Sequence, residues 1–306
     1  MAEPAKGSSF CPLFFAPASA AFSVLYSPEI PSQRQEGRTR MDKTLVVGDV
    51  HLKQEIILPR VEAAARAGVT RIVFLGDYCD EWHATDRQTL EALGLFADWT
   101  REMRGAGTDV VLLLGNHDLQ YLMGEPGPGT RASIMGEVRE ALLSLKLKAA
   151  ETIGCFLATH AGVTQTWADR FLDSPTGAEG LAAQLNGLYA RNAFAELSAC
   201  GPGRGGMSVP GPLWADAGEL WSDAARGVDQ IVGHSPVRSC EPMGAASAMA
   251  GVGSERIYLC DTFSLTSSMR PIGDASMLLV EGASVEKTGL RDGGPSWEDA
   301  VERWLR

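Results

Sequence analysis

Residues 44–51 read Thr44-Leu-Val-Val-Gly-Asp-Val-His51, a short apolar run that ends in a glycine, an acid and an imidazole. A continuous apolar run of this length is typical of a strand covered on both faces. Four further apolar runs end in short motifs that combine a glycine with an acid, an amide or an imidazole, at Gly76-Asp-Tyr-Cys-Asp80, Gly115-Asn-His-Asp118, Thr159-His-Ala-Gly162 and Gly233-His-Ser-Pro236. Because ligands bind beyond the carboxyl ends of strands in helix-covered sheets, we expect the five segments to converge.

The segments between these motifs alternate in the same way from Thr44 onward. Apolar runs predict strands at 44–47, 71–75, 110–114, 153–159, 230–232, 256–259 and 276–280. Helical spacing predicts helices at 54–67, 86–104 and 178–197 and a short docked helix at 297–305, whereas the Gly- and Pro-rich stretch 201–218 predicts a loop. This order predicts an α/β fold of layered sheet and helices.

Four of the five histidines of the chain stand inside the motifs, namely His51, His117, His160 and His234, and His83 lies just past the second motif. One motif alone would be an accident or a helix cap. Five in order, each closing a strand, indicate one shared site. Carboxylate, imidazole and amide ligands suit Mn, Fe or Zn. Two such ions about 3.5 to 4 Å apart clamp a phosphoryl oxygen and activate a water as hydroxide.

The motif order GDxH, GDxxD, GNHD, HAG and GHSP resembles the calcineurin-like metallophosphoesterase superfamily over about residues 44–280. The ending Gly233-His-Ser-Pro236 lacks a second histidine, which brings the chain closer to the serine/threonine phosphoprotein phosphatase and diadenosine tetraphosphatase branch, of bacterial or phage type. Leu220-Trp-Ser-Asp223 and Tyr258-Leu-Cys-Asp-Thr262 are similar to segments of that branch. The resemblance implies a β-sandwich of central sheets flanked by helices, with a dinuclear metal site at the strand ends.

The resemblance also implies a ligand set. One divalent ion would be held by Asp49, His51 and Asp77, and Asp77 would bridge to a second. The second ion would be completed by the three remaining ligands, Asn116, His160 and His234. We expect two divalent ions, manganese first, with iron or zinc as alternatives.

By the same resemblance, His117 would be the acid that protonates the leaving group, oriented by Asp80, whereas Asp118 would be structural. The chain departs from the phosphoprotein phosphatases at Glu81, where they have an arginine that clamps phosphate. An acid at this position should repel a dianionic phosphomonoester. Arg226 is the candidate replacement for binding substrate, and His83 is a second candidate near the substrate.

The charge and composition of the chain limit the classes of partner that it can bind. The net charge of -11 argues against specific nucleic-acid binding, since phosphate contacts need clustered Lys and Arg, although bound metal still permits a phosphorylated substrate. Six scattered cysteines read as reduced thiols, and no run of about 18 apolar residues predicts a membrane span. We therefore expect a cytoplasmic protein without membrane association. Oligomeric state cannot be inferred from these features.

The N-terminal residues 1–40 are aperiodic and read as a disordered extension before a catalytic domain at 41–306. Ala18-Ser19-Ala20 resembles a signal-peptidase site, but the charged region before it is weak. Met41 is an alternative start.

The leading hypothesis for function is hydrolysis of phosphate monoesters, from a phosphoprotein or a small molecule. The alternatives are a diadenosine-polyphosphate or other nucleotide hydrolase, and a catalytically inactive module that binds metal or a partner protein. The last is less favoured, because all six ligands and both His117 and Asp80 are present.

Overall fold

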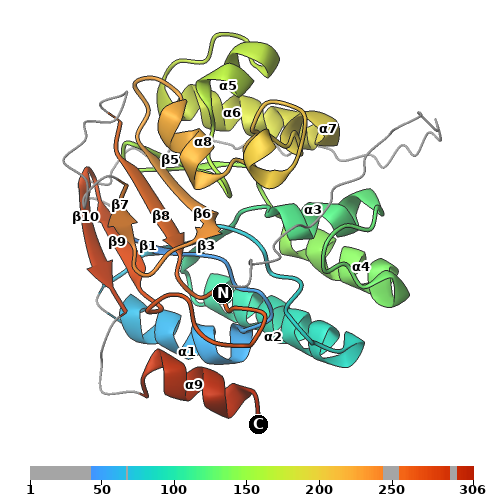
Figure 1. Ribbon diagram of the computed structural model, residues 1–306. Helices are drawn as coiled ribbons and strands as arrows, with labels where there is room; N and C mark the ends of the chain where they lie inside the picture. The colour runs from blue at the N-terminus through green and yellow to red at the C-terminus, as the bar shows by residue number, and fades with distance from the viewer. Residues whose placement is uncertain (1–42, 67, 244–254, 290–294) are drawn as a thin grey trace, which may run out of the picture.

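The computed structural model describes residues 43–66, 68–243, 255–289 and 295–306. Within them, two five-stranded sheets lie between layers of helices (Figure 1). This confirms the expected α/β architecture of central sheets flanked by helices. The extension predicted for residues 1–40 lies outside the described residues, and the domain boundary at Met41 stays a prediction.

The first sheet places three parallel strands side by side. It contains β1 (Lys43–Val47), β2 (Arg71–Phe74), β3 (Asp109–Leu112), β9 (Met277–Glu281) and β10 (Ser284–Thr288), in the order β10-β9-β1-β2-β3. β1, β2 and β3 are parallel, whereas β9 and β10 run antiparallel to their neighbours. The carboxyl ends of β1, β2 and β3 therefore open at one edge, where three of the motifs follow them.

The second sheet also has three parallel strands, here between two antiparallel edge strands. It contains β4 (Glu151–Ile153), β5 (Phe156–Ala158), β6 (Gln230–Pro236), β7 (Glu241–Pro242) and β8 (Ile257–Asp261), in the order β4-β5-β6-β8-β7. Parallel β5, β6 and β8 form its centre. Side chains from the facing sheets, such as Val46, Val73, Phe156 and Ile231, make one buried cluster between them.

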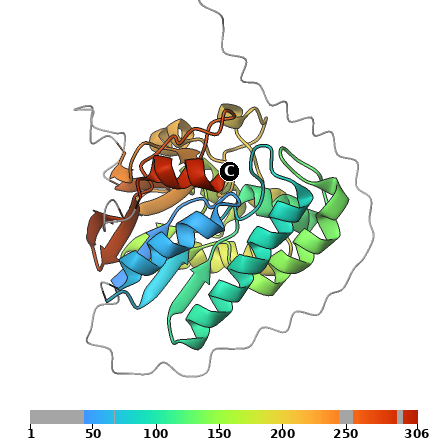
Figure 2. The same cartoon turned by 90° about the horizontal axis from the view of Figure 1, so that it is seen from below.

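Helices cover both outer faces (Figure 1). On the first sheet lie α1 (Gln54–Ala65) and α2 (Asp86–Gly105), which Figure 2 shows side by side, and α9 (Trp297–Trp304) packs against α1. Against α2 packs α4 (Met135–Leu145), which in turn contacts α3 (Asn116–Met123) and η1 (Ala132–Ile134). Above the second sheet lie α5 (Gln165–Phe171), α6 (Gly177–Ala190), α7 (Phe194–Leu197), η2 (Pro202–Arg204) and α8 (Ala217–Ser222).

Aromatic packing fixes the end of β2. Phe96 of α2 contacts Phe74 edge-on at 5.1 Å between ring centroids and stacks on Tyr78 at 4.9 Å. The Tyr78 hydroxyl donates to the Leu113 carbonyl at 2.9 Å. Such aromatic pairs contribute about 0.5–1.5 kcal/mol each beyond their burial. They hold the chain on either side of Asp77.

Two predicted elements are divided in the structure. The strand predicted at 153–159 is a hairpin, because Gly154 (φ 59°) turns the chain and its Cα faces the Gly282 carbonyl where no side chain would fit. The helix predicted at 178–197 stops at Ala190, since Asn192 (φ 57°) is left-handed and α7 follows separately. The predicted loop 201–218 contains η2 and the start of α8.

No helix among the described residues is long and apolar enough to cross a bilayer.

Candidate metal centre

The six residues predicted as metal ligands come together at the adjoining strand ends of the two sheets. Asp49, His51, Asp77 and Asn116 follow strands of the first sheet. His160 follows β5 and His234 lies in β6 of the second. Asp49 links the sheets directly, because the backbone N–H of His234 donates to its carboxylate at 3.0 and 3.1 Å.

One group consists of Asp49, His51 and Asp77, whose ligand atoms lie within 4.8 Å of one another. His51 Nδ1 donates to the Asp80 carbonyl at 2.9 Å. Its Nε2 therefore carries the lone pair, and it lies 3.5 Å from Asp77 Oδ2 and 3.9 Å from Asp49 Oδ2. A backbone carbonyl that fixes the tautomer in this way is typical of metal-ligating histidines.

A second group consists of Asp77, His160 and His234. His160 Nδ1 donates to the Leu75 carbonyl at 3.0 Å, so its Nε2 also carries a lone pair. That Nε2 lies 2.8 Å from Asn116 Oδ1, 3.1 Å from His234 Nδ1 and 3.4 Å from Asp77 Oδ2. Converging lone pairs need a cation, and the chemistry of this donor set fits divalent metal.

Asp77 Oδ2 belongs to both groups, since it faces His51 on one side and His160 on the other. Its other oxygen, Oδ1, accepts the backbone N–H of His117 at 3.0 Å. The carboxylate is thus fixed at one oxygen while the other stands between the two groups. This is the position that a bridging ligand requires.

Burial raises the pKa of the carboxyl groups in the site and lowers the pKa of three of its imidazoles. It raises the pKa of Asp77 to about 8, and burial together with the charges of Asp261 and Asp77 raises the pKa of Asp49 well above its ordinary value. Burial lowers the pKa of His160 to about 3 and that of His51 and His234 below their ordinary range. The imidazoles are neutral donors, and the buried carboxylates need positive charge beside them.

The backbone of the site is held in an unusual conformation. His51 (φ 43°), Asp77 (φ 53°) and His234 (φ 63°) all have left-handed backbones, which non-glycine residues adopt rarely. A cluster of such residues is typical of functional sites. Gly233 permits the close approach of the two sheets, since a Cβ there would lie 2.1 Å from Asp49 Oδ1.

His117 and Asp80 form a pair beside the first group. His117 Nδ1 lies 3.0 Å from Asp80 Oδ2, and its ring contacts the His51 ring edge-on at 5.2 Å between centroids. Burial lowers the pKa of His117, but the Asp77 and Asp80 carboxylates outweigh it and raise the pKa to about 9. The two carboxylates therefore favour the protonated imidazole of His117, the form that can donate a proton.

Tyr121 stabilises this pair, whereas Asp118 binds the neighbouring backbone. Tyr121, on α3, donates its hydroxyl to Asp80 Oδ1 at 2.6 Å, and no sequence motif marks this residue. Asp118 does not face the ligands: its carboxylate accepts the N–H groups of Gly115, Asp77 and Tyr78, each at 2.9 Å. The structural role expected for Asp118 agrees with these bonds.

Glu81 is paired with Lys53 in the structure, so its negative charge is compensated. Its carboxylate binds the ammonium of Lys53, and both side chains are buried, at 4% and 0% exposed. Lys53 also donates to the His51 carbonyl at 2.9 Å. The pair is neutral overall, so Glu81 does not present an unopposed negative charge to a substrate.

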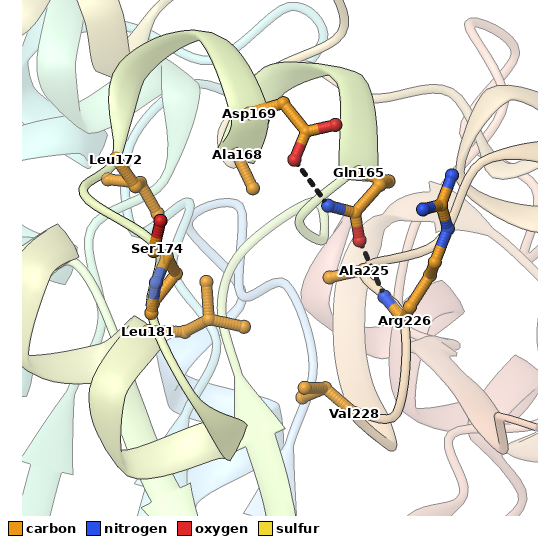
Figure 3. Close-up of a pocket in the computed structure, with 10 residues that line it drawn as sticks. Gln165, Ala168, Asp169, Leu172, Ser174, Leu181, Ala225, Arg226 and Val228 are labelled. Carbon is orange, nitrogen blue, oxygen red and sulfur yellow. Dashed lines mark hydrogen bonds between the residues drawn. The ribbon is translucent and has the colours of Figure 1, made fainter.

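The two predicted substrate residues lie outside the ligand groups. Arg226 is exposed and lines a pocket of about 170 Å³ with Gln165, Asp169 and Leu181, none of them a predicted ligand (Figure 3). Its backbone N–H donates to Gln165 Oε1 at 2.9 Å. His83 is exposed, with Nε2 3.1 Å from the Ser267 carbonyl.

Two charged residues near the ligands carried no assigned role in the sequence. Asp261 ends β8 and is buried; burial raises its pKa to about 6, and its charge acts on Asp49. Its position at the end of a strand is the sequence feature that could have marked Asp261 as a site residue. Arg204 reaches the ligands from the loop after α7, and its Nη2 donates to Ser235 Oγ at 2.8 Å. No periodicity or motif marks Arg204.

Comparison with known proteins identifies the family that this geometry resembles. The family model described as calcineurin-like phosphoesterase matches residues 43–261, which includes every predicted ligand. No curated protein sequence matches the chain.

Solved structures are similar in fold. The cold-active protein-tyrosine phosphatase of a psychrophilic Shewanella species is 18% identical, with a TM-score of 0.49 over 81% of this chain and 80% of that one. Another structure of a cold-active protein tyrosine phosphatase is 17% identical, with a TM-score of 0.53 over 83% and 81%. A metallophosphoesterase from Sphaerobacter thermophilus is 16% identical, with a TM-score of 0.38 over 87% and 99%. The TM-score of 0.53 indicates a shared fold.

Proposed function

Since this chain belongs to the calcineurin-like phosphoesterase family, and so is a hydrolase acting on phosphoric esters, we propose that its substrates are phosphate monoesters of a phosphoprotein or small molecule. Within the family we assign it to the serine/threonine phosphoprotein phosphatase and diadenosine tetraphosphatase branch. The ending Gly233-His-Ser-Pro236 supports this assignment.

We propose that two divalent ions bind at the site. Asp49, His51 and Asp77 hold one, and Asp77 with Asn116, His160 and His234 holds the other. When bound, the ions stabilise charge on the phosphoryl oxygens and acidify a water for attack. The observation that carries this proposal is the position of Asp77 Oδ2 between His51 Nε2 at 3.5 Å and His160 Nε2 at 3.4 Å. Manganese is the first candidate, with iron or zinc as alternatives.

The pair of His117 and Asp80 supplies the proton that the leaving group needs. Asp80 accepts from His117 Nδ1, and Tyr121 holds the second oxygen of Asp80, so the imidazole is fixed in one orientation. The Asp77 and Asp80 carboxylates raise the pKa of His117 and so favour the protonated imidazole, which is the form that can donate a proton to the leaving group. Proton transfer is therefore assigned to His117 and Asp80, and metal binding to the six predicted ligands.

A substrate panel tests the proposal. Metal-loaded protein is assayed with p-nitrophenyl phosphate, phosphopeptides and diadenosine tetraphosphate, and we expect the monoesters to be hydrolysed fastest. Preference for diadenosine tetraphosphate would reassign the protein as a nucleotide hydrolase. Metal binding without turnover of any ester would indicate a binding module.

A further inference from the structure

Arg204 brings a guanidinium to the edge of the metal centre from a loop that belongs to none of the motifs. Its Nη2 donates to Ser235 Oγ at 2.8 Å and approaches the His234 carbonyl at 3.4 Å. Its charge acts on His160, His234 and Asp261. Arg204 therefore adjoins the second ligand group, whereas His117 adjoins His51 of the first.

The guanidinium is held in place before any ligand arrives. Arg204 Nε lies 3.2 Å from Asp216 Oδ2, at the start of α8. The loop is fixed to the same helix by Gly203, whose N–H donates to Glu219 Oε1 at 2.8 Å. A side chain ordered in advance loses little entropy on binding.

Part of the guanidinium is available for a ligand. The Arg204 side chain is 28% exposed, and its hydrogen bonds to Ser235 and to the His234 carbonyl both use Nη2. Lys53, a second cation near the ligands, is fully buried and bound to Glu81 and the His51 carbonyl. Of these two cations, only Arg204 is exposed to solvent.

We propose that Arg204 binds the phosphoryl group of the substrate and makes the site selective for monoesters over diesters, an inference that rests on the proposed function. A guanidinium binds phosphoryl oxygens strongly through charge-assisted hydrogen bonds. A monoester offers three terminal oxygens and nearly two negative charges. A diester offers two terminal oxygens and one negative charge. The monoester therefore gains more from a fixed cation at this edge.

The test compares Arg204→Gln with the parent protein after both are loaded with Mn²⁺. We expect unchanged metal content and a fall of about 10- to 100-fold in kcat/KM for p-nitrophenyl phosphate, the loss expected for a charge-assisted hydrogen bond. The Ki for inorganic phosphate should rise by a similar factor. For bis(p-nitrophenyl) phosphate the fall should stay below about 3-fold. Arg204→Lys keeps the charge but cannot form the two parallel hydrogen bonds of a guanidinium, so its losses should lie between those of the parent and of Arg204→Gln.

Asp216→Asn is the matched control for a structural role, because it breaks the ion pair and keeps the guanidinium and the helix cap. We expect it to lower monoester activity and phosphate affinity less than Arg204→Gln does, because Ser235 still binds the guanidinium. The inference is overturned if Arg204→Gln leaves phosphate affinity unchanged, if it slows both esters equally, or if Asp216→Asn is as damaging. Should Arg204→Gln not fold, Arg204→Lys decides by the same comparison. A parent protein that binds metal and hydrolyses neither ester refutes the proposed function instead.

Discussion

At the scale of single residues, the chemistry of the site depends on which atom each side chain presents. His51 and His160 both donate Nδ1 to a backbone carbonyl, of Asp80 and Leu75, so both present Nε2 as a lone pair. The convergence of the six predicted ligands could be inferred from the sequence, because each stands in a short motif at or near the end of a strand. The positions of Arg204 and Tyr121 could not be inferred, since a loop and a helix face bring them to the site through tertiary packing.

His117→Asn should slow hydrolysis and leave the metal content unchanged. A positioned acid typically contributes about 10²- to 10⁴-fold, and the loss should be larger for an alkyl phosphate than for p-nitrophenyl phosphate, whose leaving group hardly needs protonation. Asp80→Asn should act in the same way but more mildly, because it only orients and stabilises the imidazole. Steady-state kinetics with both esters and metal analysis measure this. Loss of metal, or equal slowing of both esters, would show that His117 is a ligand or a positioning residue.

Gly233→Ala should weaken metal binding, because the new methyl group would lie 2.1 Å from Asp49 Oδ1 and displace the carboxylate. Metal titration of the chelator-treated protein measures the affinity. Gly94→Ala is the matched control, since Gly94 lies in α2 with open space at the Cβ position, and it should leave affinity unchanged. Equal affinities for both variants would show that Asp49 is not held as described.

At the scale of elements, the parallel strands were predictable because their continuous apolar runs are buried on both faces. The divisions at Gly154 and Asn192 were not, because each depends on one left-handed residue inside an apolar or helical pattern. The sequence pattern also did not predict α3, whose first residues are the Asn116 and His117 of a motif. Asp118 joins α3 to the end of β2 through three backbone N–H groups.

Asp118→Asn should therefore destabilise the fold at this junction. The amide replaces one accepting oxygen by a donor, and a buried N–H left without a partner costs about 1–3 kcal/mol. Urea unfolding of the metal-free protein measures the free energy of unfolding. Asp98→Asn, at an exposed position of α2, is the control and should change it by less than about 0.5 kcal/mol. No difference between the two variants would contradict the structural role of Asp118.

At the scale of the whole molecule, the ligands join two sheets that are distant in sequence. Asp49, His51, Asp77 and Asn116 come from the first sheet, and His160 and His234 come from the second. That the ligands converge could be predicted, because ligands bind beyond the carboxyl ends of parallel strands. The order of the strands within the first sheet could not be predicted, because β9 and β10 return to β1 from the far end of the chain. Metal bound between the sheets should stabilise the entire fold.

The stabilisation by metal should grow with pH. Burial raises the pKa of Asp77 from 3.8 to about 8, so without metal this carboxyl contributes stability that is fully present below about pH 4 and lost as pH rises through about 8. Metal binds the ionised form and reverses that loss. We expect Mn²⁺ to raise Tm more at about pH 8 than at about pH 6.5, measured by calorimetry against protein in chelator. A smaller rise at the higher pH would contradict Asp77 as a ligand.

The most direct test of the two-metal phosphoesterase is an activity titration. Chelator-treated protein is titrated with Mn²⁺ while hydrolysis of the fastest phosphate monoester of the panel is recorded. We predict negligible hydrolysis without metal and a rise that saturates at two equivalents of Mn²⁺ per chain. Asp77→Asn, which removes the shared carboxylate, should stay near the metal-free rate throughout. Full activity in chelator, saturation at one equivalent, or a normal titration of Asp77→Asn would contradict the account.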